Sequence, residues 1–412
     1  MSRCIVVGAG IVGICCGIEL RQRGLDVTIY DPEPAGSQTS SGNAGGFGFT
    51  DVMPMAGPGI VRRVPGWLLD PCGPLFVRPG YLPRLLPWLW HFHRSSSRQS
   101  VDRLSAALAS ILQASERDVR NLVREVGIAS QFSELGALTV YRSRNAFEKD
   151  TLEWEVKQSH GVEARPLQRE EIAEMEPALV NANYGWFTPQ WCNTTDPHKF
   201  TLSLADHFRG MGGTIVQQGV RAIEFTAGQA SGVVLDGGQS AAAGHVVVAA
   251  GVWSSIFCRQ AGDRVLMESE RGYNTTLPNP GVTLNRQVIF GEEKFVITNI
   301  GQGLRIGGAA EFAGLNTPPN FRRSERLVEV ARRYLPELND QNGTQWMGHR
   351  PTTPDSIPVI GTSPKVSNLH YAFGHGHYGL TMAPTTGKAI ASLVLNEIPD
   401  VDLSPFGISR FA

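Results

Sequence analysis

A glycine-rich turn close to the N-terminus constrains the fold of this chain more than any other feature of the sequence. The run Gly8-Ala9-Gly10-Ile11-Val12-Gly13 separates the apolar residues 4–7 from an apolar segment that ends near Gly24. In a G-x-G-x-x-G run, the first glycine permits a tight turn, the second lets a pyrophosphate approach the backbone, and the third lets a helix pack closely on a strand. Free amides at the positive end of that helix then bind the phosphates. The predicted dinucleotide contacts are Gly8, Gly10, Ile11, Val12 and Gly13.

A second strand and an acidic residue complete this pattern. Residues 27–30 read Val-Thr-Ile-Tyr, which favours a strand because β-branched and aromatic side chains fit a pleated sheet. Asp31 follows at the end of this strand, 18 residues after Gly13, where a carboxylate binds ribose hydroxyls. Strand, turn, helix, strand and acid together predict a βαβ dinucleotide site, but the motif alone does not separate FAD from NAD.

A loop of small polar residues follows the acid closely. Residues 40–46 read Ser-Ser-Gly-Asn-Ala-Gly-Gly, so free amides can press on a large planar ring and its pyrophosphate. A plain surface loop is the alternative interpretation. The predicted contacts in this loop are Ser40, Ser41, Asn43, Ala44 and Gly45.

Two later segments also end in glycine-rich turns. Residues 245–250 form an apolar strand that stops at Gly251, like the strand under the adenine side of FAD in Rossmann-type proteins; an ordinary core strand and turn is the alternative. Residues 374–381 read Gly-His-Gly-His-Tyr-Gly-Leu-Thr and precede a helix, whose free amides would favour negative charge on a reduced flavin. The predicted contacts are Val220, Ala250, Gly251, Trp253, Gly379, Leu380 and Thr381.

Charge and cysteine content exclude several functional classes. The 37 basic and 38 acidic residues give a net charge of −1, so no basic field exists to bind nucleic acid. The six cysteines form no C-x-x-C pair, and the histidines at 349, 370, 375 and 377 lack acidic or cysteine partners at metal-site spacing, so we predict no metal. We expect a cytoplasmic protein for three reasons. The cysteines are expected to be reduced, and the N-terminal apolar stretch carries motif glycines and is not a signal peptide. The sequence also has no window of about 18 apolar residues that could span a membrane.

The chain of 412 residues is too long for one ordinary core, so we expect two domains. Because no linker stands out, these domains are predicted to interleave. We expect an α/β fold in which a Rossmann-like dinucleotide-binding domain (1–130, 194–262 and 345–412) alternates with an antiparallel-sheet α+β substrate domain (131–193 and 263–344). Residues 51–100 are predicted to be irregular. Helices are predicted at 11–23, 102–126, 147–159, 194–211, 321–335 and 383–396.

One arginine lies in an unusual turn. Residues 348–355 read Gly-His-Arg-Pro-Thr-Thr-Pro-Asp, and the proline after Arg350 restricts the backbone. A fixed guanidinium in a largely neutral site is a natural anchor for a substrate carboxylate, because it can donate two parallel hydrogen bonds. A structural salt bridge is the alternative interpretation.

These motifs together resemble the D-amino acid dehydrogenase branch of the FAD-dependent D-amino acid oxidase and glycine oxidase superfamily. The resemblance runs from residue 1 to about residue 400. The glycine run at 8–13 is generic, whereas the runs at 348–355 and 374–381 are much more specific. Further points of similarity are the loop after Asp31, the segment 56–78 and the triplet Arg271-Gly272-Tyr273.

The resemblance implies non-covalent FAD and oxidation of an amine α to a carboxylate, with electrons passed to a quinone or another carrier instead of O₂. A hydride would leave the substrate Cα, the neutral amine lone pair would drive imine formation, and water would hydrolyse the imine to a 2-oxo acid and ammonia. Cyclic substrates would give a ring imine. The aromatic residues Tyr273, Trp346 and Tyr378 favour a compact or cyclic substrate, such as D-proline or hydroxy-D-proline.

The resemblance also assigns candidate catalytic residues. Arg350 matches the arginine of the family's G-x-R-P run near the substrate, and the other candidates are Tyr273, His377 and Tyr378. Many oxidases of the superfamily carry a second carboxylate-binding arginine on a substrate-domain strand. This chain has Thr and Asn at 298–299, where that residue would fall, so the carboxylate clamp departs from the family pattern.

Other functions remain open at this point. A glycine or sarcosine oxidase would use O₂, and a flavin-bearing subunit would act within a larger electron-transfer complex. A flavin-dependent RNA-modifying domain is disfavoured by the neutral charge. The aromatic residues 84–94, with arginine at both ends, predict either a peripheral contact with the cytoplasmic face of the inner membrane or a buried irregular segment.

Overall fold

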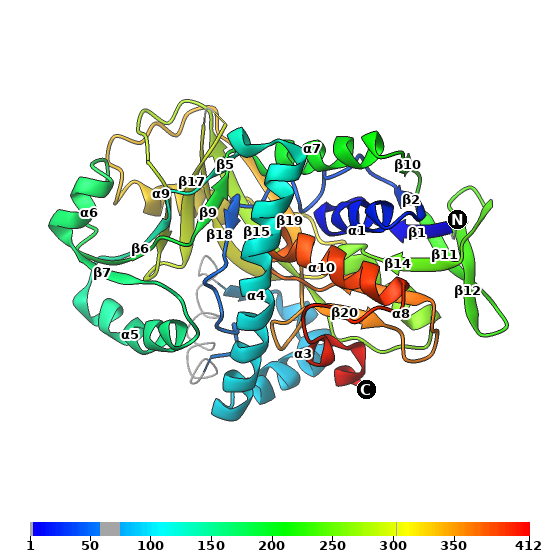
Figure 1. Ribbon diagram of the computed structural model, residues 1–412. Coiled ribbons are helices and arrows are strands. Elements are labelled where there is room, and N and C mark those ends of the chain that lie inside the picture. Colours follow the sequence, from blue (N-terminus) through cyan, green and yellow to red (C-terminus); the bar gives the residue numbers. More distant parts are fainter. Residues whose placement is uncertain (1–2, 58–74, 302) are drawn as a thin grey trace.

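Two large sheets lie side by side, and a long helix crosses in front of their boundary (Figure 1). The computed structural model describes residues 3–57, 75–301 and 303–412. The mostly parallel sheet lies toward the right of Figure 1 and the larger sheet toward the left, with α4 between them at the front. This arrangement confirms the expected combination of an α/β unit with a second, antiparallel unit.

The first sheet has the strand order β10-β2-β1-β14-β21-β20. Its central strands are continuous apolar runs because helices and loops cover both faces, and only β20 runs antiparallel to its neighbour. The predicted strand, glycine turn, helix and second strand are therefore confirmed. The strand bounds are β1 Arg3–Val7, β2 Asp26–Asp31, β10 Thr214–Gln217, β14 His245–Val248, β20 Val359–Thr362 and β21 Leu369–Phe373.

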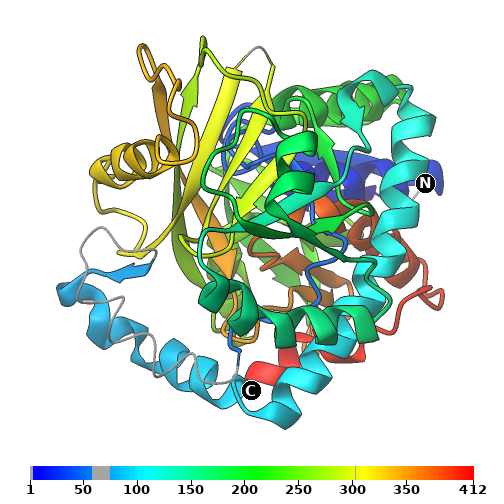
Figure 2. The same cartoon turned by 90° about the vertical axis from the view of Figure 1, so that its left-hand side faces the viewer.

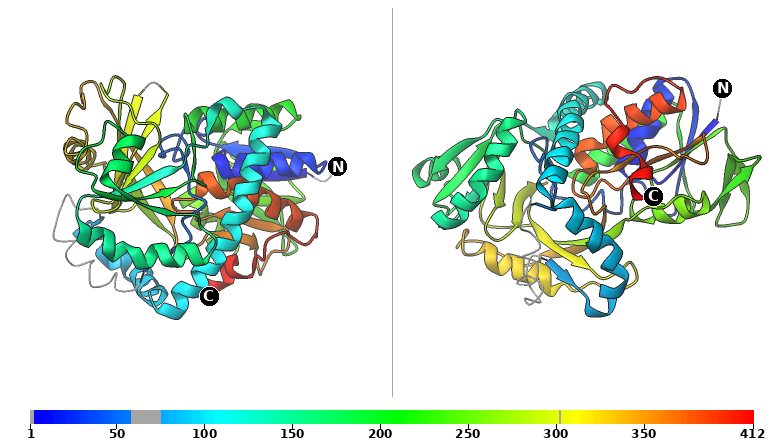
Figure 3. Two further views of the ribbon diagram at one scale, coloured as in Figure 1. Left: turned by 60° about the vertical axis from the view of Figure 1, so that its left-hand side comes forward. Right: turned by 90° about the horizontal axis from the view of Figure 1, so that it is seen from below.

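Helices α1 and α10 lie side by side on one face of this sheet (Figures 1 and 3). They approach closely because α10 carries a glycine at the crossing: a Cβ on Gly387 would lie 2.6 Å from the Cys15 carbonyl oxygen. Helix α7 begins at the N-cap Asp196, whose carboxylate accepts from two backbone amides. The helix bounds are α1 Ile11–Gln22, α3 Leu82–Ser95, α4 Arg98–Val126, α5 Arg144–Ser159, α6 Arg169–Met175, α7 Pro197–Gly210, α8 Ser254–Gln260, α9 Arg322–Ala331 and α10 Gly379–Val394.

The second large sheet has the order β19-β15-β18-β17-β16-β6-β8-β7, with β4 beside β18. It is antiparallel except where β16 pairs with β6 and where β18 pairs with β4. The antiparallel sheet expected in the second unit is thus confirmed. The bounds are β4 Leu75–Val77, β6 Ala137–Tyr141, β7 Arg165–Gln168, β8 Tyr184–Thr188, β15 Glu268–Leu277, β16 Gln287–Phe290, β17 Phe295–Ile300, β18 Gly303–Phe312 and β19 Thr344–Thr352.

Two small sheets complete the described strands. One has the order β11-β12-β13 and the other the order β3-β9-β5. The bounds are β3 Gly46–Phe47, β5 Phe132–Ser133, β9 Cys192–Thr194, β11 Val220–Thr226, β12 Gln229–Leu235 and β13 Ser240–Ala242.

The prediction that residues 51–100 are irregular is wrong for the last part of that range. Residues 82–95 form α3, and α4 begins at residue 98, where Ser97 caps it, rather than at 102. Two prolines argued against a helix in this part of the sequence. However, Pro83 lies in the first turn of α3, where a backbone N–H would make no hydrogen bond within the helix, so proline is tolerated there. Leu85 and Trp88 bury one side of α3. The similarity noted over 56–78 falls mostly on 58–74, outside the described residues.

The C-terminal helix begins four residues earlier than predicted. We expected it at 383–396, but α10 starts at Gly379, directly after the turn His375–Tyr378, and includes Pro384.

The pairing of the strands also bears on the proposed domain boundaries. Because β19 pairs with β15, we now propose that residues 345–352 belong with the antiparallel unit. In the described part of the chain, no helix is both long and apolar enough to cross a membrane.

Candidate active site

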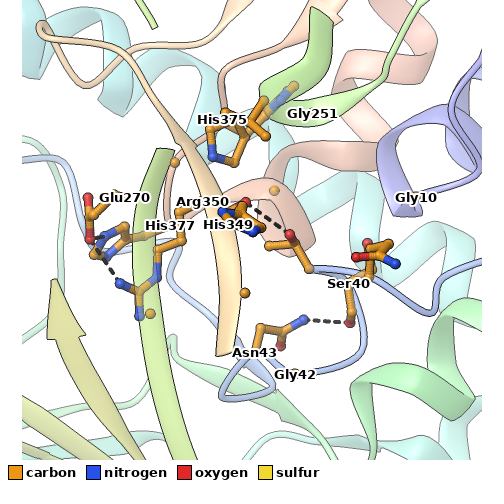
Figure 4. A pocket seen from close by; sticks show the side chains of 18 of the residues that line it. Gly10, Ser40, Gly42, Asn43, Gly251, Glu270, His349, Arg350, His375 and His377 are labelled. Carbon is orange, nitrogen blue, oxygen red and sulfur yellow. Dashed lines mark hydrogen bonds and ion pairs between the residues drawn. The ribbon is translucent and has the colours of Figure 1, made fainter. Parts of the chain in front are cut away.

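A cavity of about 1120 Å³ extends between the two large sheets. Its walls come from the glycine turn after β1, the loop after β2, the end of β14, strands β15, β18 and β19, and the start of α10. Figure 4 shows Gly10 and Gly251 on one side of this space and Glu270, Arg350 and His377 on the other.

The glycine turn meets the geometric requirements of a pyrophosphate cradle. A Cβ on Gly8, at φ +112°, would lie 2.5 Å from the Ala249 carbonyl oxygen, and one on Gly13 would lie 1.9 Å from the Gly8 carbonyl oxygen. These two glycines are therefore required by the fold itself. Gly10 differs, because its added Cβ would meet only the Ser40 hydroxyl at 3.4 Å. Gly10 faces the cavity, so only a ligand there requires it to be glycine.

Asp31 is held in place at the end of β2 by two backbone amides. Its Oδ2 accepts from the Ala9 amide at 2.7 Å, and its Oδ1 accepts from the Glu33 amide at 2.9 Å. Burial raises the pKa of Asp31, although the two amides oppose that rise. Each carboxylate oxygen keeps a lone pair for a further donor, which fits a ribose hydroxyl.

The loop 40–46 is locked between the two sheets and is not a plain surface loop. Ser40 Oγ accepts from the Ile11 amide at 3.0 Å, and Asn43 bridges the Ser40 carbonyl and the Gly45 amide, each at 2.8 Å. From the antiparallel sheet, Arg305 donates to the Asn43 carbonyl at 2.7 Å. The loop thus forms a rigid part of the cavity wall (Figure 4).

Most of the residues predicted to contact the cofactor or the substrate line this cavity. They are Gly8, Gly10, Ile11, Val12, Asp31, Ser40, Asn43, Ala44, Val220, Ala250, Gly251, Trp253, Tyr273, Arg350, His377, Tyr378, Gly379 and Leu380. Four others lie outside the wall of this cavity: Gly13, Ser41, Gly45 and Thr381. Thr381 is buried and accepts from the Gly48 amide at 3.0 Å, so its hydroxyl holds the segment after the loop instead of facing the cavity.

The histidines that we weighed as metal ligands do not converge. His349 contacts Ser269 Oγ at 2.7 Å, His375 contacts Thr386 Oγ1 at 2.9 Å, and His370 on β21 contacts His245 at 3.3 Å. Burial lowers the pKa of His375 to about 3, and burial with the nearby Arg271 lowers that of His349 to about 4. Among the described residues, no group of three or more potential ligands is arranged to hold a metal ion.

Arg350 belongs to a charge cluster around the buried Glu270, a partner that the sequence did not predict. Its Nη1 donates to Glu270 Oε1 at 2.9 Å, and Nε2 of His377 donates to the same oxygen at 2.8 Å. Thr352 donates to Glu270 Oε2 at 3.2 Å. Burial opposes ionisation of Glu270, but His377 and Arg350 outweigh it and lower its pKa to about 2. Glu270 is therefore an anion at any working pH.

Strand register explains how this cluster forms. Glu270 on β15 lies directly opposite Arg350 on β19, although the two are 80 residues apart in sequence. Gly272 leaves room for the guanidinium, because a Cβ there would lie 2.3 Å from Arg350 Nη2. The sequence singled out Arg350 from its run but gave no signal for Glu270. Their partnership depends on a register that the sequence does not reveal.

Tyr273 borders the cavity, but its hydroxyl is already engaged. It donates to the buried carboxylate of Glu311 and accepts from the Asn320 amide at 3.2 Å. Arg271, fully buried, also pairs with Glu311 at 3.4 Å. We therefore revise the expectation that the Tyr273 hydroxyl acts on a substrate: this group stabilises a cluster within the antiparallel unit.

Comparison with known proteins agrees with this geometry. The profile of a family described as "FAD dependent oxidoreductase" matches residues 3–393. The chain belongs to this family. It is 34% identical over 414 residues to a D-amino-acid oxidase of Bradyrhizobium diazoefficiens, covering 98% of each chain. It is 32% identical over 421 residues to a D-amino acid dehydrogenase of Xanthobacter autotrophicus, covering 100% of this chain and 99% of the relative.

Solved structures at lower identity share the fold. The glycine oxidase of Geobacillus kaustophilus superposes with a TM-score of 0.78 at 22% identity, with full coverage of both chains. The L-proline dehydrogenase of P. horikoshii gives a TM-score of 0.77 at 19% identity, covering 100% of this chain and 97% of the other. Membership establishes an FAD-dependent oxidoreductase, and the expected cofactor and enzyme class are confirmed.

Proposed function

We propose that this protein oxidises D-amino acids at the amine carbon, with compact or cyclic ones such as D-proline among its substrates, and passes the electrons to a quinone or another carrier. Relatives named D-amino acid dehydrogenase and D-amino-acid oxidase support the substrate class. The observation that carries the proposal is the pairing of Arg350 with Glu270 on the wall of the cavity.

This pair offers opposite charges side by side, as an amino acid zwitterion requires. Arg350 Nη1 is used by Glu270 and by the Ala309 carbonyl at 3.1 Å, which fixes the plane of the guanidinium. Among the described residues, no hydrogen bond uses its other nitrogens, so they can donate to a substrate carboxylate. The anionic Glu270 attracts the ammonium group of the incoming amino acid, which must lose a proton before the hydride leaves. Because the pair is neutral overall, it does not by itself attract a dicarboxylate.

FAD fits the residues of the opposite wall. We propose that Gly10 and the first amides of α1 hold its pyrophosphate, that Asp31 holds the ribose, and that the start of α10 faces the ring. Bound FAD would supply the two-electron oxidation of the substrate. The five described cysteines are buried and none borders the cavity, so no thiol there is placed for attachment to the cofactor. Acid precipitation should therefore release FAD into the supernatant, and yellow colour left in the pellet would contradict this.

The protein's own contribution is to orient the substrate and exclude water. Trp346 and Tyr378 border the cavity, and the Trp346 ring lies where a Cβ on Gly42 would be, so this side of the chamber is tightly packed. A compact substrate held by its carboxylate at Arg350 would have little rotational freedom left. Such positioning is the main way in which a cofactor enzyme's protein part raises the rate.

Anaerobic reduction of the bound flavin tests the substrate class. The protein is mixed without O₂ with a panel of D- and L-amino acids, glycine and sarcosine, and bleaching of the yellow absorbance is followed. We expect the fastest bleaching with D-amino acids, and with D-proline among them. Faster bleaching by glycine or sarcosine would instead indicate the amine oxidase alternative.

Oxidation by O₂ is the second candidate for the electron acceptor, since one relative is named an oxidase. Reoxidation of the reduced protein by air-saturated buffer is compared with reoxidation by a soluble quinone. The proposal expects the quinone to act faster, with little hydrogen peroxide formed. Rapid and stoichiometric peroxide formation would assign the protein to the oxidases.

A further inference from the structure

Helix α3 has two apolar faces with different surroundings. Leu85 and Trp88 are buried against Phe312, and together with Leu89 and Phe92 they form a small core of their own. On the other side, Leu82, Leu86 and Trp90 have exposed fractions of 40, 56 and 61%. At 100° per residue, positions four apart form one line along a helix, so these three side chains make a continuous exposed apolar stripe.

The chain around this stripe is cationic. Residues 75–101 contain no aspartate or glutamate, whereas the whole protein has a net charge of −1. Four arginines of this stretch are exposed, namely Arg78, Arg84, Arg94 and Arg98. An apolar stripe with basic residues around it and a tryptophan on it is the composition of helices that lie in the surface of an anionic bilayer.

The same helix borders the cavity. Leu82, Trp88, Leu89 and Phe92 of α3 line it, together with Leu75 and Val77 of β4. Leu82 is both a lining residue and an exposed one, so this apolar end of the cavity reaches the protein surface beside the stripe. Figure 2 shows α3 at the edge of the molecule, away from the parallel sheet.

We propose that the exposed stripe of α3 docks on an anionic lipid bilayer, so that the apolar end of the cavity opens toward the membrane. An apolar electron acceptor dissolved in the bilayer could then reach the cavity without crossing water. This inference rests on the proposed use of a carrier other than O₂, and it adds the surface that would meet that carrier. We assign a lipid bilayer as the partner of the stripe, because positive charge and exposed apolar side chains occur together on this one helix.

Flotation with lipid vesicles tests the surface independently of catalysis. The full-length FAD-loaded protein is mixed with vesicles of phosphatidylcholine alone or with phosphatidylglycerol added. We compare the wild type with Leu86→Ser/Trp90→Ser and with Arg84→Glu/Arg94→Glu. Neither Leu86 nor Trp90 lines the cavity. The matched control is Leu152→Ser on α5, which removes a leucine with an exposed fraction of 71% far from the stripe in sequence.

The wild type and Leu152→Ser should float with phosphatidylglycerol vesicles, and each double variant should bind at least about tenfold more weakly, because basic and apolar contacts both contribute. Activity with a water-soluble dye should stay unchanged in all variants, whereas activity with quinone embedded in the vesicles should fall in the double variants. Failure of the wild type to float would overturn the proposal, as would equal flotation of the Leu86→Ser/Trp90→Ser variant.

Two further outcomes are distinguishable. If the protein self-associates without lipid and Leu86→Ser/Trp90→Ser makes it monomeric, the stripe is an interface between copies and the membrane proposal is wrong. If the wild type floats as expected but no amino acid reduces the flavin, the proposed function fails while the docking surface stands.

Discussion

The wall of the cavity on the parallel sheet and the wall on the antiparallel sheet are built from different interactions. The first consists of backbone and glycines that are close in sequence, such as Gly8 and Gly13, with Asp31 fixed by two amides. The second consists of charged side chains joined across strands, with Glu270 and Arg350 at its centre. A wall of backbone suits a cofactor that is always the same, whereas a wall of side chains can be adapted to a particular substrate.

Changing the backbone wall should have the largest effect. In Gly10→Val, the side chain would occupy the space that we assign to the pyrophosphate, and we expect purified protein without flavin. Among the described residues, an added Cβ on Gly10 would meet only Ser40, so the variant should still fold. Its melting temperature should equal that of the wild-type protein without FAD. The matched control is Gly210→Val, at a glycine whose Cβ would meet nothing within 4 Å. Stoichiometric flavin in Gly10→Val would place the cofactor elsewhere.

Changing the charged wall should affect catalysis and leave the flavin bound. We expect Arg350→Ala to retain FAD and to lose about ten- to a hundredfold in kcat/KM, since a charge-assisted contact contributes about 1.5–3 kcal/mol. Arg350→Lys should recover little, because lysine cannot donate two parallel bonds. Both quantities are measured per bound flavin on one preparation.

Arg350→Ala also leaves the buried Glu270 with only His377 and Thr352 as partners, which lowers stability. The double variant Arg350→Met/Glu270→Gln separates the two effects, because it removes both charges. We expect its melting temperature to return toward that of the wild type while kcat/KM stays low. If kcat/KM also returned, Arg350 would serve only as a structural ion pair.

A smaller effect is expected on the stability of the protein at acidic pH. The pKa of Glu270 is lowered to about 2, below its ordinary value near 4.3. Its ion pairs therefore stabilise the folded state fully at pH values above the pKa that Glu270 has in the unfolded chain. That contribution is lost as the pH falls through the range from about 4 to about 2. Urea unfolding midpoints measured from pH 7 to pH 3 should therefore fall less steeply in Glu270→Gln than in the wild type. Parallel curves for the two proteins would show that Glu270 is not a buried anion.

The smallest effect is expected at Tyr273. Its hydroxyl contacts Glu311 and not the cavity, so Tyr273→Phe should change kcat/KM by less than about twofold while it lowers the melting temperature. Trp346→Phe, on the cavity wall, provides the contrast, with a change mainly in kcat/KM. A large loss of kcat/KM in Tyr273→Phe at unchanged stability would restore the tyrosine as a catalytic residue.

The two walls also differ in how far the sequence predicts them. The glycine run, Asp31 and the apolar strand at 245–248 are local patterns, and local patterns determine a βαβ unit. Arg350 could be singled out from the run 348–355, although it lies in strand β19 and not in the turn that we expected. Glu270 could not be singled out, because its role depends on a strand register that brings together residues 80 positions apart.

Helix α3 was missed for a different reason. Its two prolines argue against a helix when propensity alone is considered, yet one lies in the first turn and the other faces solvent. The buried contacts of Leu85 and Trp88 stabilise the helix, and tertiary packing of that kind overrides local propensity. The same packing leaves the opposite apolar face exposed, whereas the sequence left a peripheral contact and a buried segment as alternatives for residues 84–94.

The stereochemistry of flavin reduction tests the central claim most directly. The oxidised protein is mixed anaerobically with the D- and L-forms of one amino acid, such as proline, and the loss of flavin absorbance is followed over time. With the carboxylate held at Arg350, only one enantiomer presents its Cα–H correctly, and misplacement of the reacting bond by about 1 Å costs about a hundredfold in rate. We predict that the D-form reduces the flavin at least about a hundredfold faster than the L-form. Equal rates for the two forms, or faster reduction by the L-form, would contradict the account.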